Sequence, residues 1–401
     1  MIYDVVIIGA GIAGLYAATR LRKKLGPKAH ILVLEKYKHK WLGGRTNNEM
    51  FQGVNVVTGA GIGRKRKDKL LMKLLAEYRI ANTEFTVLHQ YAKTIHNPVD
   101  VGEITNFLRR EFEKTPEKWQ GKTFKQFAIE IIGEQGYNNY VLCLGYSDFE
   151  KEDVYEVLYM YGLEDNESGW KGVMIPWHTL IEKMSKNVSI QYQRDVDRIV
   201  PVEKDYFIVT TTDEKQYECK QIVIATTITS IRKLLPRHKI YKEVEGQPFL
   251  RLYGKFDKKS AEKMNEVVSK TTIVPGPLQK MIPMGQGVYM IAYSDNRRAE
   301  WFTKDRMENN MTNREFLCRV IEKSLGMEDK SLKMMAIKDY YWPIGTHYYK
   351  PRKYVTYPYR EFLYDLQHPM DGITVVGEVV SANHGWVEGA LESVTKGLMI
   401  E

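Results

Sequence analysis

Residues 3–14 read YDVVIIGAGIAG, and the rest of the sequence is best understood outward from them. The β-branched run from Val5 to Ile8 is typical of a strand that is buried on both faces of a parallel sheet. The glycines that follow have the spacing Gly-x-Gly-x-x-Gly, and apolar residues then recur at helical spacing from Leu15 to Leu25. The segment therefore predicts a strand, a tight turn and a helix in that order.

The glycine spacing gains meaning from a second apolar strand, residues 31–34, which ends at Glu35. Strand, glycine turn, helix and strand together form the context of a dinucleotide-binding fingerprint. In that context Gly9 permits the tight turn, Gly11 lets a pyrophosphate approach the backbone, and Gly14 lets the helix pack closely on the strand. The helix N-terminus supplies N–H donors to the phosphates, and Glu35 can accept hydrogen bonds from a ribose diol. FAD and NAD share this fingerprint.

Two further glycine-rich segments favour one of these cofactors. Residues 42–46 read LGGRT, and residues 57–63 read VTGAGIG. With these segments the chain resembles the flavin amine oxidase family. In that family a GGR motif wraps the flavin with its arginine against the cofactor phosphates, and a glycine-rich turn passes beside the isoalloxazine. The resemblance assigns these roles to Gly43, Gly44, Arg45, Gly59 and Ala60.

The C-terminal segment carries a matching motif. Residues 372–378 read GITVVGE and residues 385–393 read GWVEGALES, which is similar to the family's closing pattern of a GE turn followed by GYVEGA. In relatives the carboxylate of the GE pair holds the ribityl or phosphate part of FAD, and the next helix N-terminus faces the flavin O2. Two residues depart from the pattern: Trp386 replaces a tyrosine, and Val394 replaces a glycine.

Two central strands complete the resemblance. Residues 195–199 resemble the strand whose backbone valine contacts adenine in relatives, which gives Val196. Residues 221–226 read QIVIAT and predict a buried strand that returns the chain to the cofactor domain. Motifs and resemblance together assign cofactor contacts to Gly9, Gly11, Ile12, Ala13, Gly14, Glu35, Lys36, Gly43, Gly44, Arg45, Gly59, Ala60, Gly61, Val196, Ala225, Gly377, Glu378, Trp386 and Val387.

The order of the motifs predicts an α/β fold with a Rossmann-type, GR2-like FAD-binding domain. We expect this domain to be discontinuous and to comprise residues 1–80, 172–245 and 365–401. By resemblance, residues 81–171 and 246–364 form an α+β substrate domain, with a helical flank in the first insertion and a mixed sheet over the flavin in the second. Strands of that sheet are expected at residues 249–256, 288–293 and 335–342.

The resemblance also implies the chemistry. Relatives remove hydride from the carbon that bears an amine nitrogen, with flavin N5 as acceptor, and then pass electrons to dioxygen. Many of them carry a lysine that positions a water at N5. Arg251 occupies that position here, and Lys255 follows on the same strand face four residues later. Arg251 can orient water but cannot donate a proton at neutral pH. An ion pair between Arg251 and a carboxylate or phosphate is the equal alternative.

Relatives flank the amine with two aromatic side chains. Trp386 fits one wall, and Tyr348 or Tyr349 fits the other, with Tyr348 as the named candidate; a core role is the simpler interpretation for either tyrosine. Members that attach FAD covalently use a cysteine just before this tyrosine. This chain has His347 there, and we expect FAD to be bound non-covalently.

Composition sets outer limits. The 401 residues carry 59 basic and 50 acidic side chains, for a formal net charge of +9. We interpret this excess as a lysine-rich soluble surface rather than a nucleic-acid site. The basic run 64–69 is accordingly expected to be a solvated loop, and the acidic residues of 148–156 a solvent face, with steering of cationic amines as the alternative. No apolar stretch suits a membrane helix, and the Cys and His spacing indicates neither a disulfide framework nor a metal site.

These observations predict a cytoplasmic FAD-dependent amine oxidase. Its expected partners are a small-molecule amine and dioxygen, without nucleic acid, and it would be a monomer or homodimer. Arg251 leaves room for desaturation, protoporphyrinogen-type oxidation or isomerisation on the same fold, and a non-catalytic flavin-binding protein is a further alternative. The positive net charge would repel a cationic substrate, which weakens polyamines and favours small monoamines or amino acids.

Overall fold

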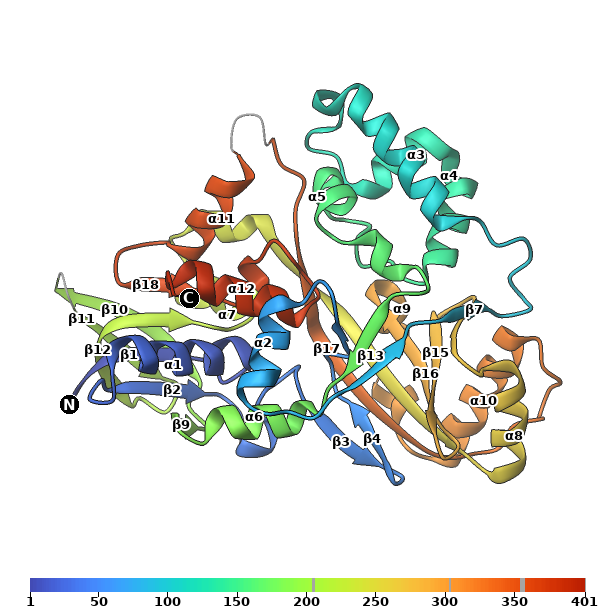
Figure 1. The fold of residues 1–401 in the computed structure, drawn as a ribbon, viewed down its shortest axis with the longest axis horizontal. Coiled ribbons are helices and arrows are strands. Elements are labelled where there is room, and N and C mark those ends of the chain that lie inside the picture. Colours follow the sequence, from blue (N-terminus) through green and yellow to red (C-terminus); the bar gives the residue numbers. More distant parts are fainter. Residues whose placement is uncertain (204–205, 303, 354–357, 401) are drawn as a thin grey trace.

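Two large sheets, two small sheets and a helical insertion make up the described part of the fold (Figure 1). The structure is a computed structural model, and it describes residues 1–203, 206–302, 304–353 and 358–400. The first sheet lies on the left of Figure 1, the second lies at its lower right, and the insertion stands above the second.

The first sheet combines strands from the N-terminal, central and C-terminal parts of the chain. Its order is β10 (Val196–Glu203), β11 (Tyr206–Thr211), β12 (Gln216–Ile224), β1 (Ile2–Ile8), β2 (Ile31–Glu35) and β9 (Ser189–Tyr192), and β18 (Ile373–Val375) also pairs with β12. The pairs β12–β1, β1–β2, β2–β9 and β12–β18 are parallel, whereas β10, β11 and β12 pair antiparallel. Carboxyl ends of parallel strands meet at one edge, so the residues after Ile8, Ile224 and Val375 lie together there.

Helices cover both faces of this sheet. This explains why residues 5–8 of β1 are all apolar. Val5 and Ile7 belong to one core cluster, and Val6 and Ile8 belong to another, because successive side chains point to opposite faces. The first cluster includes α1 (Ile12–Leu25), α2 (Lys69–Glu77), α6 (Trp177–Ser185) and α12 (Val387–Gly397). The second includes α7 (Ile228–Leu234) and α11 (Tyr359–Gln367). The predicted Rossmann-type unit is confirmed.

The second sheet is mixed, as expected. Its order is β17 (Met334–Tyr349), β13 (Val244–Phe256), β16 (Val288–Asp295), β15 (Lys280–Gly285), β14 (Thr271–Ile273) and β7 (His89–Tyr91). Only the β14–β7 pair is parallel among these described strands. One face packs on α8 (Lys258–Val267), α9 (Asn296–Glu300) and α10 (Met311–Leu325). The other contacts the hairpin of β3 (Asn48–Phe51) and β4 (Val54–Val57).

The last strand of this sheet runs further than the sequence predicts. We expect a strand that ends at Trp342, before Pro343, but β17 continues to Tyr349. Proline removes a ladder hydrogen bond and is tolerated mainly on edge strands. β17 is the edge strand, so Pro343 does not interrupt it. The extension carries His347 and Tyr348 alongside the start of β13.

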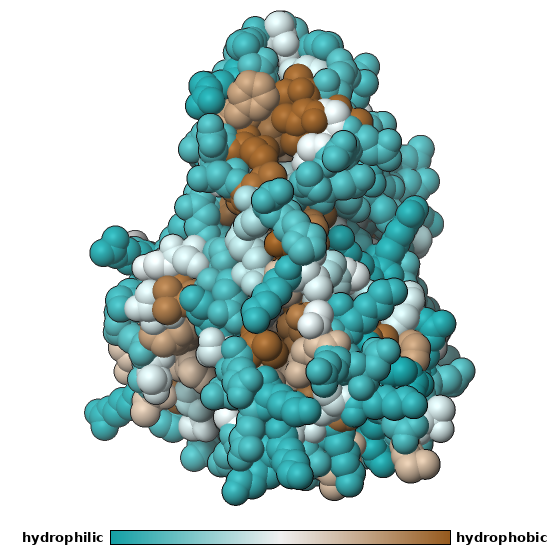
Figure 2. Space-filling view, turned by 90° about the vertical axis from the view of Figure 1, so that its right-hand side faces the viewer, coloured by the Kyte–Doolittle hydropathy of each residue, from teal (hydrophilic) through white to brown (hydrophobic). Residues whose placement is uncertain are grey.

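The helical insertion has an apolar core of its own. Its helices are α3 (Val101–Lys114), α4 (Phe124–Leu144) and α5 (Val154–Tyr159), and its base joins the small sheet of β5 (Gly63–Arg64), β8 (Lys171–Met174) and β6 (Thr83–Thr86). Figure 2 shows apolar side chains gathered on this insertion, and half-buried isoleucines of α3 and α4 are Ile104, Ile129, Ile131 and Ile132. No helix in the described part of the chain has the length and apolarity to cross a membrane.

The acidic residues of 148–156 do not form a solvent face, so that expectation is wrong. Asp148, Glu152, Asp153 and Glu156 are buried, and Glu150 is half-buried. Asp153 accepts hydrogen bonds from the backbone N–H groups of Tyr155 and Arg352, and Glu156 pairs with the Arg352 guanidinium. The carboxylates therefore fasten the insertion to the segment that follows β17. Composition alone did not reveal this, because the partner lies far along the chain.

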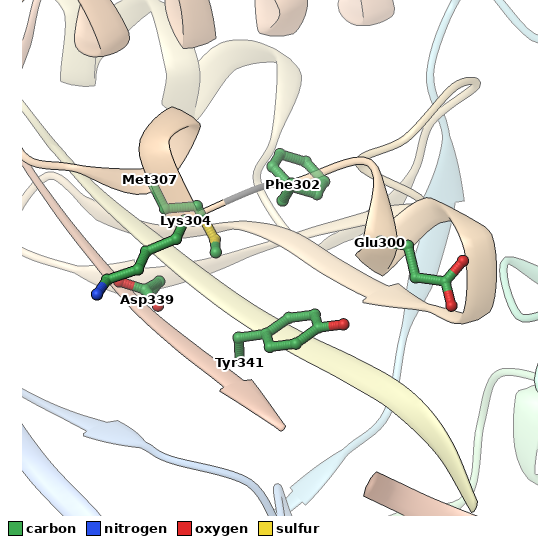
Figure 3. A pocket seen from close by; sticks show the side chains of 6 residues that line it. All are labelled: Glu300, Phe302, Lys304, Met307, Asp339 and Tyr341. Atoms are coloured by element: carbon green, nitrogen blue, oxygen red, sulfur yellow. The ribbon is translucent and has the colours of Figure 1, made fainter. Parts of the chain in front are cut away.

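A separate hollow opens on the second sheet (Figure 3). Its lining residues are Glu300, Phe302, Lys304, Met307, Asp339 and Tyr341. In Figure 3 the ring of Tyr341 lies between Glu300 and the neighbouring Asp339 and Lys304. None of the sequence-predicted site residues lines this hollow, so it is distinct from the site described next.

Candidate active site

The glycine turn after β1 forms an open cradle at the N-terminus of α1. A Cβ on Gly14 would lie 1.9 Å from the Gly9 carbonyl oxygen, so helix and turn meet at a distance that only glycine allows. A Cβ on Gly11 would meet no atom within 4 Å. Neither a capping side chain nor an acidic first-turn residue occupies the helix N-terminus. The N–H groups and open space there fit a dinucleotide pyrophosphate.

The next two predicted contacts lie at the same sheet edge. Glu35 ends β2, and its carboxylate accepts from the backbone N–H groups of Ala10 (2.7 Å) and Tyr37 (2.9 Å). Burial raises the pKa of Glu35. Two carboxylate oxygens offer more acceptor positions than these two bonds use, so ribose hydroxyls can still be bound. Lys36 pairs with Asp195, directly before the buried Val196.

The GGR segment and the turn at residues 59–61 lie against each other. The Gly43 N–H donates to the Ala10 carbonyl (3.1 Å), and the Ala60 N–H donates to the Arg45 carbonyl (2.7 Å). The Arg45 guanidinium reaches the Gly345 carbonyl at 2.7 Å. Residues predicted from three separate motifs are thus brought together at one edge.

The remaining predicted contacts surround these segments. Ile12 and Ala13 are buried in the first turn of α1, and Val387 begins α12. A Cβ on Gly9 would meet the Ala225 carbonyl oxygen at 2.5 Å, which places Ala225 against the glycine turn. Positions 44 and 61 are open, since a Cβ at either would meet nothing within 4 Å.

Glu378, after Gly377, is the polar centre of the site. Its carboxylate accepts from the His347 backbone N–H (2.9 Å), the His347 Nδ1 (2.6 Å), the Gly385 N–H (3.1 Å) and Arg45 (3.2 Å). Burial opposes ionisation, but the donors from His347 and Arg45 outweigh it and hold the pKa of Glu378 far below its ordinary value. The Ile228 N–H donates to His347 Nε2 at 3.2 Å, so Nδ1 carries the proton of a neutral imidazole. For His347, burial disfavours the charged imidazolium and lowers the pKa of the ring.

The second sheet forms a roof over the 57–59 segment. Three successive carbonyl oxygens of that segment accept side-chain hydrogen bonds: Tyr253 Oη to Val57 (2.7 Å), Trp342 Nε1 to Thr58 (2.7 Å) and Arg251 Nη2 to Gly59 (3.0 Å). β13 supplies two of these donors and β17 the third. The roof is therefore held in register with the turn that, by resemblance, passes beside the flavin.

The structure brings Arg251 to this turn but not Lys255. Arg251 is only 3% exposed, and its guanidinium lies 3.4 Å from the Tyr293 ring centroid and 4.0 Å from that of Phe249. No carboxylate of the described residues forms an ion pair with it. Lys255 lies four residues further along β13, and its ammonium donates to the Gln286 carbonyl in an exposed contact.

Trp386 is backed by a residue that the sequence placed in a solvated loop. Arg64 is buried, and its guanidinium lies 4.0 Å from the Trp386 ring centroid. The same guanidinium pairs with Asp68 (2.7 Å) and Asp165 (2.8 Å) and donates to Asn383 (3.3 Å). The expectation of a solvated loop is wrong for Arg64 and Asp68, which are buried. It is correct for the other four residues of the run, which are exposed: Lys65, Arg66, Lys67 and Lys69.

The structure also separates the two tyrosines proposed for the second wall. Tyr349 is fully buried, donates to the Ser381 carbonyl at 3.0 Å and packs against Phe362 in the core. Tyr348 points to the opposite face of β17, as the strand alternation requires. Tyr348 therefore remains the predicted candidate for the second wall.

Sequence reasoning missed Lys280, Tyr146 and Tyr293. The Lys280 ammonium lies 3.2 Å from the Tyr146 ring centroid, and the Tyr146 and Tyr293 rings are 5.4 Å apart. Lys280 follows a turn and is the first residue of strand β15. Many surface lysines have the same position at the start of a strand. Only the packing of the insertion on the second sheet reveals its burial.

The fold and this edge define a Rossmann-type dinucleotide-binding protein whose cofactor edge is roofed by a second sheet. A family model for flavin containing amine oxidoreductases matches residues 113–395, and one for an NAD(P)-binding Rossmann-like domain matches residues 7–78. The first match spans more than half of the chain, so the chain belongs to the flavin containing amine oxidoreductase family. It is an amine oxidoreductase, and its family implies a flavin cofactor.

Solved structures of putrescine oxidase share the fold. The wild-type enzyme with putrescine bound is 14% identical, with a TM-score of 0.74 over 99% of this chain and 98% of that one. A double mutant is 15% identical, with a TM-score of 0.73 over 98% and 97%. At this identity the likeness shows the fold. No curated protein sequence matches the chain.

The cradle predicts opposite outcomes for two glycine substitutions. Gly11→Ala adds a methyl group where no atom lies within 4 Å, so the free energy of unfolding of the apoprotein should change by less than about 0.5 kcal/mol. The methyl group enters the space for the pyrophosphate, and FAD affinity should fall about tenfold or more. Gly14→Ala should instead destabilise the apoprotein, because its Cβ collides with Gly9. Urea unfolding and flavin absorbance after gel filtration measure both; equal effects of the two substitutions would contradict the assignment.

Arg64→Met should destabilise the protein by about 3–5 kcal/mol, since it leaves Asp68 and Asp165 without their buried cation. The matched control is Arg66→Met, at an exposed position of the same run, with an expected change within about 0.5 kcal/mol. Urea unfolding gives both values. A destabilisation by Arg64→Met no larger than the control's would show that the buried network contributes nothing.

Stability should decrease below pH 6.5 partly through His347. Burial lowers the folded pKa of His347, so the unfolded chain binds a proton that the folded chain refuses. Its contribution is therefore complete above the unfolded pKa of about 6.5 and declines as pH falls below that value. Glutamine can retain both side-chain hydrogen bonds, so His347→Gln should flatten the pH dependence of the free energy of unfolding. Identical slopes for the two proteins would refute this assignment.

Proposed function

We propose that this chain is an FAD-dependent amine oxidase that oxidises the C–N bond of a small amine, with dioxygen as electron acceptor and hydrogen peroxide and an imine as products. The observation that carries the proposal is the meeting of Gly11, Arg45, Glu378 and the Gly59 turn under one roof, in a chain of the amine oxidoreductase family. The putrescine oxidase likeness supports an amine as the substrate class.

The cofactor would be held by groups with complementary chemistry. The α1 N-terminus and the open Gly11 position suit the pyrophosphate, Glu35 the ribose diol, and Arg45 the phosphates. Bound FAD supplies the hydride-accepting centre of the reaction. Both ring nitrogens of His347 are engaged by Glu378 and the Ile228 N–H, which supports non-covalent binding.

The protein's own residues orient the amine and exclude water. Trp386 and Tyr348 are the proposed aromatic walls of the amine slot. The three roof hydrogen bonds keep β13 and β17 over the 57–59 segment and limit access of bulk solvent. Arg251 orients a water or the substrate at the turn. The proposed cofactor domain comprises residues 1–80, 172–245 and 365–401, and the proposed substrate domain the two insertions.

A screen of the FAD-loaded protein tests this function. Monoamines, putrescine and L-amino acids are added without oxygen, and loss of the visible flavin absorbance is followed; peroxide is measured in air. We expect at least one amine to reduce the flavin and to generate peroxide. Flavin reduction without peroxide would indicate that the electron acceptor is not dioxygen. A protein that cannot be loaded with FAD would refute the proposal.

Two neighbouring tyrosines supply a matched test of the amine slot. Tyr348→Ala should lower kcat/KM for the reactive amine about tenfold or more, because one aromatic wall is lost. Tyr349→Phe removes only the hydrogen bond to Ser381 in the core and should change kcat/KM less than about threefold. Stopped-flow flavin reduction measures both. A larger effect at position 349 would place the slot elsewhere.

A further inference from the structure

Arg251 differs from the other buried arginines of the described chain. Arg20, Arg64 and Arg352 each pair with a carboxylate: Glu77, Asp68 with Asp165, and Glu156, respectively. Arg251 is more deeply buried than any of these, and no described carboxylate pairs with it. Its Nη2 donates to Gly59, whereas Nε and Nη1 are buried without an acceptor, as are the same two atoms of Arg352. Each unmade buried hydrogen bond costs about 1–3 kcal/mol.

The guanidinium of Arg251 lies against two aromatic rings. Tyr293 and Phe249 contact the guanidinium at 3.4 and 4.0 Å from their ring centroids. Donors at a guanidinium edge match carboxylate oxygens in geometry as well as in charge. The Gly59 contact places this edge beside the turn that, by resemblance, borders the flavin.

A second cation lies in the same aromatic cluster. Lys280 is 6% exposed, and its ammonium lies 3.2 Å from the Tyr146 centroid and 6.0 Å from the Tyr293 centroid. Tyr293 is thus a contact of Arg251 and a neighbour of Lys280. Burial lowers the pKa of Lys280 to about 7 against the attraction of Asp295 and Asp148. An anion bound beside Lys280 would favour its charged form.

Among the described residues, neither nearby acid forms an ion pair with Arg251 or Lys280, although both attract Lys280. Asp295 accepts from the Ser147 N–H (2.9 Å), the Ser147 hydroxyl (2.5 Å) and Gln279 Nε2 (3.0 Å), so its hydrogen bonds hold the insertion on the sheet. Asp148 accepts from the Tyr161 hydroxyl at 2.6 Å. Burial and the Asp295 charge raise the pKa of Asp148 to about 8, which favours its neutral form at pH 7.

We propose that Arg251, supported by Lys280, binds a carboxylate of the substrate, so that the amine oxidised here is an amino acid or another amine that carries an acid group. This inference rests on the proposed function and narrows its substrate class. A simple diamine would bring a second positive charge toward Arg251 and Lys280.

Three benzene derivatives of similar size and different charge test the proposal: benzoate, benzamide and benzylammonium. Each is titrated into the FAD-loaded protein, with calorimetry and the visible flavin spectrum as readouts. Benzoate should bind at least tenfold more tightly than benzamide, and benzylammonium should bind most weakly. Preference for benzylammonium, or equal affinity for benzoate and benzamide, would overturn the proposal. This series uses the unmodified protein and does not depend on how a variant folds.

Variants then assign the site. Arg251→Met should weaken benzoate binding about thirtyfold, Arg251→Lys less, and Lys280→Met about tenfold. Lys338→Met, which removes an exposed cation from the neighbouring strand β17, is the control and should leave benzoate affinity unchanged. Benzoate affinity that survives Arg251→Met would overturn the assignment. Because binding is read without turnover, selective benzoate binding without amine oxidation would refute only the proposed function, and amine oxidation without benzoate binding only this inference.

Discussion

Three hydrogen bonds to the consecutive carbonyls of Val57, Thr58 and Gly59 hold the second sheet over the cofactor edge, together with the contacts of β17 to Arg45 and Glu378. Each such bond contributes about 0.5–1.5 kcal/mol. Their main effect is on geometry. Three donors on two neighbouring strands, β13 and β17, fix both the position and the orientation of the roof. A shift of β13 by one residue would turn its donors to the opposite face. The placement of Arg251 over the Gly59 turn follows from this constraint.

Buried charge is distributed unevenly around the site. Glu378 is ionised and receives four donors, including Arg45, on the cofactor side. On the roof side, Arg251 retains two donors without acceptors. In the proposed function, a dinucleotide would supply negative charge to the first region, and the second would remain available to the substrate. The formal net charge of +9 therefore says less about partners than does Arg251, the one buried arginine in the described part of the chain that lacks a carboxylate partner.

Buried carboxylates also join the helical insertion to the rest of the molecule. Asp153 caps α5 and receives the backbone N–H of Arg352, and Asp295 receives two groups of Ser147. These contacts join segments that are 199 and 148 residues apart in sequence. The insertion is thereby fixed over the second sheet, where Tyr146 reaches Lys280 and Tyr293. Pairs so distant leave no periodic signal, which is why residues 148–156 read as a solvent face.

The sequence by itself determined the local units of this protein. The segment from Val5 to Glu35 specifies its strand, turn and helix through contacts between near neighbours, and glycine is required wherever backbone meets backbone, as at Gly14. Tertiary structure decided which separated residues share one environment. Pro343 lies within a strand because β17 is an edge strand, Arg64 is buried because Asp165 and Trp386 surround it, and Lys280 is buried because Tyr146 covers it. Burial and pairing of charge depend on long-range packing, and local sequence cannot encode that packing in a readable pattern.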